Sequence, residues 1–329
     1  MRQYSVIING FGRIGRSVLR AWLGGGWPGL QIVGVNDIAP LETCAYLFEY
    51  DSVFGPWRGE VRTEDGGLVV DGRRIPFSTV ANLRDRDLSG VDLVMECTGR
   101  GSDRAFAERA LEAGARRVLV SGPSLEADWT LVLGANDADL SREHRIVSNA
   151  SCTTNAVAPL VKLLDGAFGI ETGHMTTVHC YTGSQPTVDM PMANPARSRA
   201  AALSMVPTTT SAQALTDLVL PGLAGRIQGS AVRVPVASVS AVDLSVMTRQ
   251  GPDRGAVNAV LRGAEGGIIG VTGKPLVSSD LRQRPESIVM ATPETQVSDG
   301  GMVRVFGWYD NEWGFANRML DVAIRMSKF

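Results

Sequence analysis

The chain has 329 residues, more than one hydrophobic core usually serves, so we expect two domains. Its formal net charge is −2 and 44% of its residues are hydrophobic, which gives no general attraction to nucleic acid or to an acidic membrane surface. No apolar run approaches the roughly 18 residues of a membrane span, and the short run Val6-Ile7-Ile8 leads straight into a glycine motif. We therefore expect neither membrane insertion nor secretion, and no nucleic-acid partner.

The four cysteines, Cys44, Cys97, Cys152 and Cys180, are scattered along the chain. They lack the close spacing of a disulfide framework or a zinc site, so we expect free thiols, a reducing cytoplasm and no bound metal. Lysine is rare in the sequence, which leaves arginine as the expected phosphate-binding side chain.

The segment Gly10-Phe11-Gly12-Arg13-Ile14-Gly15 has the spacing G-x-G-x-x-G. It follows a predicted strand over 4–9 and precedes a helical pattern through Val18, Leu19 and Trp22. In this context the first glycine allows a tight turn, the second lets the backbone approach a pyrophosphate, and the third allows close helix packing. The helix N-terminus would receive the negative charge.

A second predicted strand, over 31–35, ends at Asn36-Asp37. Asp37 stands about 20 residues after the glycines, where an acid can accept hydrogen bonds from both adenosine ribose hydroxyls. Because a carboxylate at this position repels a 2′-phosphate, the pattern favours NAD over NADP.

Strands and helices continue to alternate, which predicts a doubly wound parallel sheet. Thr98-Gly99 and Ser121-Gly122 follow two of the strands, at the sheet edge where ligands bind in this architecture; each could equally be a plain turn. The predicted elements are strands over 93–97, 117–121 and 130–133 and a helix over 103–113.

Cys152 lies among hydroxyl and amide side chains in Asn149-Ala150-Ser151-Cys152-Thr153-Thr154-Asn155. A helical pattern follows at once, so we expect Cys152 near a helix N-terminus, where free N–H groups and the positive dipole end favour a thiolate. The alternative is an inert buried thiol. His179, on a predicted strand over 174–182, is the candidate proton acceptor for this cysteine, although a lone histidine is more often structural.

Two later features are candidate anion sites. Thr208-Thr209-Thr210-Ser211 opens a predicted helix and supplies hydroxyl and N–H groups, after a long segment over 189–205 that we expect to be an extended loop. Arg233 is a charge within the apolar strand pattern 230–236. Such an arginine binds a ligand or forms a partly buried ion pair.

These motifs together resemble the phosphorylating glyceraldehyde-3-phosphate dehydrogenase family. The resemblance runs from the glycine motif through Ala150-Ser151-Cys152-Thr153-Thr154-Asn155 and Thr176-Thr177-Val178-His179 to Trp308-Tyr309-Asp310-Asn311-Glu312-Trp313-Gly314. It implies a Rossmann NAD-binding domain over 1–150, an α+β catalytic domain with a mixed, mostly antiparallel sheet over 151–311, and a C-terminal helix over 312–329 that packs back on the first domain.

The resemblance also implies the chemistry and the partners. Cys152 would attack the aldehyde carbon of a phosphorylated aldose, His179 would take the hydroxyl proton as hydride passes to NAD, and inorganic phosphate would cleave the thioester. Thr182 and Arg233 would hold the substrate phosphate. The residues matched to the attacking phosphate or the transition-state oxygens are Ser151, Thr153, Thr210 and Arg197. The positions matched to cofactor contacts are Gly10, Phe11, Gly12, Arg13, Ile14, Gly15, Asp37, Thr98, Ser121 and Asn311. The family is typically a homotetramer, with the loop 189–199 crossing toward a neighbour's cofactor.

The sequence departs from the family pattern at several positions. Phe54 stands where histidine is frequent, Ser211 where glycine commonly follows the threonines, and Phe315 where tyrosine is usual; the 189–199 loop also lacks the usual adjacent arginines. The segment 312–321 is similar to the sister erythrose-4-phosphate dehydrogenases, which release an acid by hydrolysis, so this activity remains an alternative. A non-catalytic nucleotide-binding or redox-sensing protein, in which Cys152 is only oxidisable, is a more remote alternative.

Overall fold

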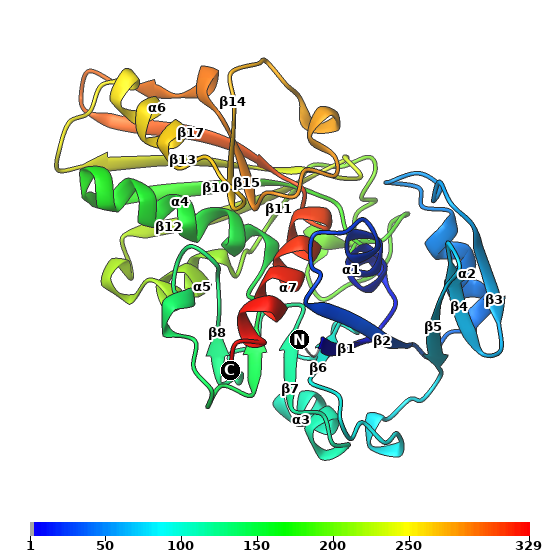
Figure 1. The fold of residues 1–329 in the computed structure, drawn as a ribbon. Coiled ribbons are helices and arrows are strands. Elements are labelled where there is room, and N and C mark those ends of the chain that lie inside the picture. Colours follow the sequence, from blue (N-terminus) through cyan, green and yellow to red (C-terminus); the bar gives the residue numbers. More distant parts are fainter. Residues whose placement is uncertain (1–2) are drawn as a thin grey trace. The chain divides into compact units, whose positions relative to one another are not determined.

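The computed structural model describes residues 3–329, and the chain divides into two compact units (Figure 1). Of the described residues, the first unit contains 3–131, 137–150 and 316–329, and the second contains 132–136 and 151–315. No helix within residues 3–329 is long and apolar enough to span a membrane.

The first unit is built on a nine-stranded sheet with the order β3-β4-β5-β2-β1-β6-β7-β9-β8. Strands β2, β1, β6, β7, β9 and β8 are all parallel, which confirms the predicted doubly wound sheet. The strands are β1 (Tyr4–Asn9), β2 (Leu30–Asn36), β3 (Val61–Glu64), β4 (Gly67–Val70), β5 (Arg73–Ser78), β6 (Leu93–Glu96), β7 (Arg117–Val120), β8 (Trp129–Thr130) and β9 (Ile146–Ser148). The helices are α1 (Arg13–Leu23), α2 (Leu41–Glu49), α3 (Arg104–Glu112) and most of α7 (Trp313–Met326).

One strand of this unit is shorter than expected. The strand predicted over 130–133 is wrong beyond Thr130, where β8 ends. The chain turns instead, because the N–H groups of Ala135 and Asn136 both donate to the carbonyl oxygen of Val132, at 3.0 and 3.2 Å.

The final helix, α7, is tied to the first unit by polar contacts from distant parts of the chain. The indole N–H of Trp27 donates to Asp321 at 2.7 Å, and the guanidinium of Arg117 donates to the carbonyl oxygen of Met326 at 2.5 Å. These contacts bring the C-terminal segment beside the loop before β2 and the start of β7.

The second unit has a mixed, mostly antiparallel sheet in the order β11-β12-β10-β13-β17-β15-β14, with β16 paired to β17. Its strands are β10 (Ile170–Cys180), β11 (Val206–Thr208), β12 (Ile227–Val234), β13 (Ser240–Thr248), β14 (Ile269–Thr272), β15 (Ile288–Ala291), β16 (Gln296–Val297) and β17 (Met302–Tyr309). Its helices are α4 (Cys152–Phe168), α5 (Ala212–Val219) and α6 (Arg254–Gly263). Six short 3-10 turns complete the elements of the two units, at Leu83–Asp85, Asp137–Asp139, Pro195–Ser198, Pro221–Leu223, Ser278–Leu281 and Thr292–Glu294.

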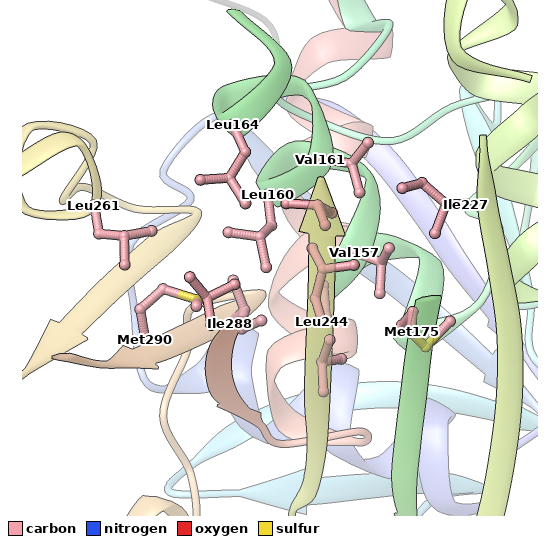
Figure 2. Packing of buried hydrophobic residues seen from close by; sticks show 14 of the residues in the cluster. Val157, Leu160, Val161, Leu164, Met175, Ile227, Leu244, Leu261, Ile288 and Met290 are labelled. Carbon is pink, nitrogen blue, oxygen red and sulfur yellow. The ribbon is translucent and has the colours of Figure 1, made fainter. Parts of the chain in front are cut away.

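Helix α4 is fixed by its apolar face. Val157, Leu160, Val161 and Leu164 recur at helical spacing, are fully buried and meet side chains of the sheet such as Leu244 (Figure 2). Truncating one such leucine to alanine typically costs about 2–5 kcal/mol. The packing therefore fixes where the N-terminus of α4, which carries Cys152, meets the second unit's sheet.

Candidate active site

Cys152 is the first residue of α4, as the sequence predicted. Ser151 caps the helix: its hydroxyl accepts a hydrogen bond from the N–H of Thr154 at 3.1 Å. Ala150, just before the cap, has a φ of +53°, which turns the chain sharply between β9 and α4. Cys152 as a whole is only partly buried.

His179 faces this sulfur from β10. The distance from its Nε2 to the Sγ of Cys152 is 3.6 Å, within hydrogen-bond range for sulfur. Its other ring nitrogen, Nδ1, lies 2.7 Å from the carbonyl oxygen of Cys180. In the tautomer that carries its proton on Nδ1, the Nε2 lone pair faces the thiol, and this is the tautomer that a general base needs.

Arg233 joins the pair because of strand register. Strands β10 and β12 run parallel with His179 opposite Arg233. The Nη1 of Arg233 lies 2.9 Å from both the Nδ1 of His179 and the carbonyl oxygen of Cys180, and 3.5 Å from the hydroxyl of Thr182. Among residues 3–329 Arg233 forms no salt bridge. The alternative of a partly buried ion pair therefore does not account for its position beside His179.

Burial shifts the pKa values of both members of the pair. Burial, with the adjacent charge of Arg233, lowers the pKa of His179 to about 4. Burial raises the pKa of Cys152, although hydrogen bonds from Thr153 and the charge of Arg233 oppose the rise. Desolvation of Cys152 thus opposes the thiolate that the helix N-terminus favours.

Tyr309 is a residue of this site that the sequence did not single out. Its buried hydroxyl lies 2.7 Å from the hydroxyl of Thr153 and 2.8 Å from that of Thr177, and its ring lies edge-on to His179 with centroids 6.0 Å apart. It thus connects α4, β10 and β17 under the Cys152–His179 pair. The available signal was its place in the motif Trp308–Gly314, which the sequence analysis used only for the family resemblance.

The expected phosphate-binding residues fall into two groups. Thr182 and Arg233 come together beside His179, within 3.5 Å of each other. Thr153 is only 4% exposed and its hydroxyl is bonded to Tyr309, which leaves its main-chain N–H as the group that could meet an anion. Thr210 lies just before α5, where its hydroxyl accepts from the N–H of Ala212 at 3.1 Å. Arg197 lies in the turn Pro195–Ser198. Among residues 3–329 its guanidinium makes no hydrogen bond or ion pair that links it to the Cys152 site.

The first unit holds a separate cavity of about 320 Å³ at the carboxyl ends of β1, β2 and β6. Gly10, Gly12, Asp37 and Thr98 are among its lining residues. The carboxylate of Asp37 is oriented by the N–H groups of Phe11 and Ala39, at 2.6 and 2.8 Å.

The glycines of the motif are required by the backbone beside this cavity. Gly10 has a φ of +94°, and a Cβ there would lie 2.6 Å from the carbonyl carbon of Cys97. A Cβ on Gly15 would lie 2.1 Å from the carbonyl oxygen of Gly10, whereas one on Gly12 would meet nothing within 4 Å. The free space at Gly12 is what the close approach of a pyrophosphate requires.

Other residues expected at the cofactor have protein partners. Arg13 forms a salt bridge with Asp51 and lies over the ring of Phe54, at 5.2 Å from its centroid. Asn311 belongs to the second unit, where its side-chain oxygen lies 3.0 Å from the sulfur of Cys180. Among the described residues no group of histidine, cysteine, aspartate and glutamate could hold a metal ion.

Comparison with known proteins decides the family. A model of the NAD-binding domain of glyceraldehyde 3-phosphate dehydrogenase matches residues 4–104, and a model of the C-terminal domain of the same enzyme matches residues 151–311. Proteins named glyceraldehyde-3-phosphate dehydrogenase from Xanthobacter flavus and Cereibacter sphaeroides are 46% and 45% identical to this chain, each over 98% of both chains. A protein named glyceraldehyde-3-phosphate dehydrogenase 1 from Bacillus subtilis is 44% identical over 98% of this chain and 97% of its own.

The chain belongs to the glyceraldehyde-3-phosphate dehydrogenase family. The resemblance stated from the motifs is thereby confirmed, and so are the Rossmann fold and NAD as the cofactor. As a member of this family, the chain is an NAD-dependent oxidoreductase, and the cavity beside Gly12 and Asp37 fits that cofactor.

The departures from the glyceraldehyde-3-phosphate dehydrogenase pattern are accommodated locally. Phe54 provides the aromatic face under Arg13, and Phe315 is 5% exposed, within the apolar packing at the start of α7. Neither replaces a group that contacts Cys152 or His179.

Proposed function

We propose that the chain catalyses the NAD-dependent oxidative phosphorylation of D-glyceraldehyde 3-phosphate to 1,3-bisphosphoglycerate. The observation that carries the proposal is the 3.6 Å approach of the His179 Nε2 to the Cys152 Sγ, in a chain that is 46% identical to a protein named glyceraldehyde-3-phosphate dehydrogenase. A nucleophile within hydrogen-bond reach of an oriented base is the arrangement that covalent catalysis needs.

The first step forms a bond between the Cys152 sulfur and the aldehyde carbon. The thiol proton passes through the Nε2 of His179 to the aldehyde oxygen, which becomes the hydroxyl of a hemithioacetal. His179 is suited to this relay because its low pKa keeps the imidazole neutral, and therefore able to accept a proton, at any pH well above 4.

The second step oxidises the hemithioacetal to a thioester. His179 takes the hydroxyl proton while the carbon loses a hydride. When bound, NAD supplies the acceptor for that hydride. We propose that the residues holding it are those of the glycine motif, Asp37, Thr98 and Ser121, with Asn311 from the second unit. The carboxylate of Asp37 would accept from the ribose hydroxyls.

The last step transfers the acyl group to inorganic phosphate. A phosphate oxygen attacks the thioester carbon, the carbon–sulfur bond breaks, and the Cys152 sulfur leaves and regains a proton. Thr182 and Arg233 would hold the phosphate of the substrate, because a guanidinium beside a hydroxyl provides several donors for one anion. Ser151, Thr153 through its N–H, Thr210 and Arg197 would hold the attacking phosphate.

We further propose a cytoplasmic homotetramer in which the loop 189–199 crosses toward the cofactor of a neighbouring subunit. Large apolar side chains that flank this loop support an interface, because they are exposed in the single chain: Val188 by 73%, Leu203 by 86% and Met205 by 74%.

The test of the activity is NADH formation by the purified protein, followed by absorbance. D-Glyceraldehyde 3-phosphate and erythrose 4-phosphate are each supplied with and without inorganic phosphate, and the Cys152→Ser variant serves as control. The proposal predicts phosphate-dependent turnover of the triose phosphate and none by the variant. Phosphate-independent turnover that prefers the tetrose would instead assign the hydrolytic reaction.

A further inference from the structure

A second cavity in the first unit, of about 220 Å³, lies at the opposite edge of the sheet from the cofactor cavity. Its position follows from the topology: Tyr4, Asp92 and Arg117 stand at the amino ends of β1, β6 and β7, and Arg145 immediately precedes β9. These four strands are neighbours in the sheet, so their amino ends gather at one place. The glycine motif follows the carboxyl end of β1, so it lies at the opposite edge of the sheet.

The cavity carries an excess of positive charge. Four arginines line it, Arg116, Arg117, Arg142 and Arg145, against one side-chain carboxylate among the described residues, that of Asp92, and the main-chain end at Phe329. That carboxylate is 4% exposed and already accepts from the N–H and the hydroxyl of Ser5, both at 2.9 Å, and from Arg116 at 3.4 Å. Together, the Asp92 carboxylate and the main-chain end at Phe329 compensate only part of the charge of the four guanidinium groups.

A structural role accounts for only part of this cluster. Arg117 is 8% exposed and donates to the carbonyl oxygens of Met326 and Phe329, at 2.5 and 3.3 Å, so it closes the end of α7. Arg145 donates to the carbonyl oxygen of Arg116 at 3.4 Å. Arg142 and Arg145 are exposed, and within residues 3–329 neither forms a salt bridge with a carboxylate.

Tyr4 adds a neutral hydrogen-bond donor to the wall of the cavity. Burial raises the pKa of Tyr4 to about 12, against the influence of Arg117, so the phenol keeps its proton. Gathering like charges around a cavity is unfavourable unless a counter-charge enters it, and the planar guanidinium group binds phosphate oxygens two at a time.

We propose that this cavity, which we call the arginine cavity, binds a small di- or triphosphate anion, either inorganic or the phosphate tail of a nucleotide. Arg117 forms its fixed inner wall, and the exposed Arg116, Arg142 and Arg145 close on the anion from outside. Because the arginine cavity lies at the amino ends of the strands, its occupant is distinct from the NAD bound beside Gly12.

The test is calorimetric titration of the NAD-saturated protein at low ionic strength with inorganic pyrophosphate, with ATP and with inorganic phosphate. Saturation with NAD blocks the cofactor cavity. Three proteins are compared: wild type, R142Q/R145Q, and the control R58Q/R282Q, which removes two exposed arginines outside the cavity and changes the net charge equally. R116Q is a second variant in case the first fails to fold.

The proposal predicts that R142Q/R145Q or R116Q weakens pyrophosphate binding at least tenfold, while the control retains wild-type affinity and all variants retain dehydrogenase activity. Tighter binding of ATP than of pyrophosphate would identify a nucleotide as the occupant, and equal or weaker binding an inorganic anion. Equal affinity of all the proteins would overturn the proposal, because the binding would then belong to the phosphate-holding groups near Cys152.

Discussion

At the scale of single residues, the environment of His179 sets both its chemistry and its effect on stability. Burial and the guanidinium of Arg233 depress its pKa to about 4, whereas an unfolded histidine titrates near 6.5. Between these values the unfolded chain binds a proton that the folded chain does not. Stability from this group is thus fully present above about pH 6.5 and is lost as the pH falls toward 4.

We therefore predict that the free energy of unfolding falls by about 2 kcal/mol from pH 7 to pH 5 because of the shifted pKa of His179 alone. Denaturant unfolding of His179→Asn should lack this part of the pH dependence. His174→Asn, which changes an exposed histidine of the same strand, is the matched control and should follow the wild type. A variant at position 179 that loses stability as steeply as the wild type would refute the assignment.

A second residue-scale feature is the hydroxyl of Tyr309, which serves two buried threonines at once. The Tyr309→Phe variant leaves Thr153 without its partner, while Thr177 keeps its bond to the carbonyl oxygen of Ala241. A buried unsatisfied hydroxyl costs about 1–3 kcal/mol, so we predict a loss of that size in the free energy of unfolding, and a several-fold lower kcat because Thr153 adjoins Cys152.

Urea unfolding and steady-state kinetics check this prediction. Tyr46→Phe is the control, because Tyr46 is 61% exposed on α2 and the change should stay within about 0.5 kcal/mol. Equal stability of the two variants would mean that the hydroxyl of Tyr309 contributes nothing to the site.

At the scale of elements, the turn between β1 and α1 separates a steric role of glycine from a binding role. In Gly15→Ala the new Cβ meets the carbonyl oxygen of Gly10 at 2.1 Å, so we predict a loss of stability of roughly 1–3 kcal/mol or more. In Gly12→Ala the new Cβ meets no protein atom within 4 Å. That variant should keep its stability and bind NAD at least tenfold more weakly.

Thermal unfolding together with NAD titration distinguishes the two variants. Unaltered NAD affinity in Gly12→Ala would show that the cofactor does not approach the backbone at this glycine. The pair serves as its own control, since each variant adds the same methyl group to the same turn.

The same elements show what the sequence could and could not predict. The run Tyr4–Asn9 and the helical pattern after it define β1 and α1, because local periodicity and glycine spacing are sufficient there. Strand β8 was predicted too long, because the turn that ends it depends on bonds to the carbonyl oxygen of Val132. No local pattern encodes those bonds.

The candidate site divides in the same way. Cys152 and His179 were identifiable from residue type and local motif. The position of Arg233 against His179 follows from the register of two parallel strands, and Tyr309 meets Thr153 from 156 residues away in sequence. The pKa shifts of the pair depend on burial, which only the folded chain determines.

At the scale of the whole molecule, the proposed tetramer gives a prediction about the loop that precedes β11. Leu203 is 86% exposed in the single chain, so an aspartate there should destabilise an interface without disturbing the fold. We predict that Leu203→Asp shifts sedimentation from a tetramer to smaller species. Leu125→Asp, at a residue that is 80% exposed in the first unit, should sediment as the wild type does.

The central claim is that Cys152 carries the acyl group and that inorganic phosphate removes it. Intact-protein and peptide mass spectrometry after mixing the enzyme with NAD and D-glyceraldehyde 3-phosphate tests this claim most directly. We predict a phosphoglyceroyl adduct on the peptide that contains Cys152 when phosphate is absent, and its disappearance when phosphate is added. An adduct on another residue, or one that phosphate leaves in place while water removes it, would contradict the account.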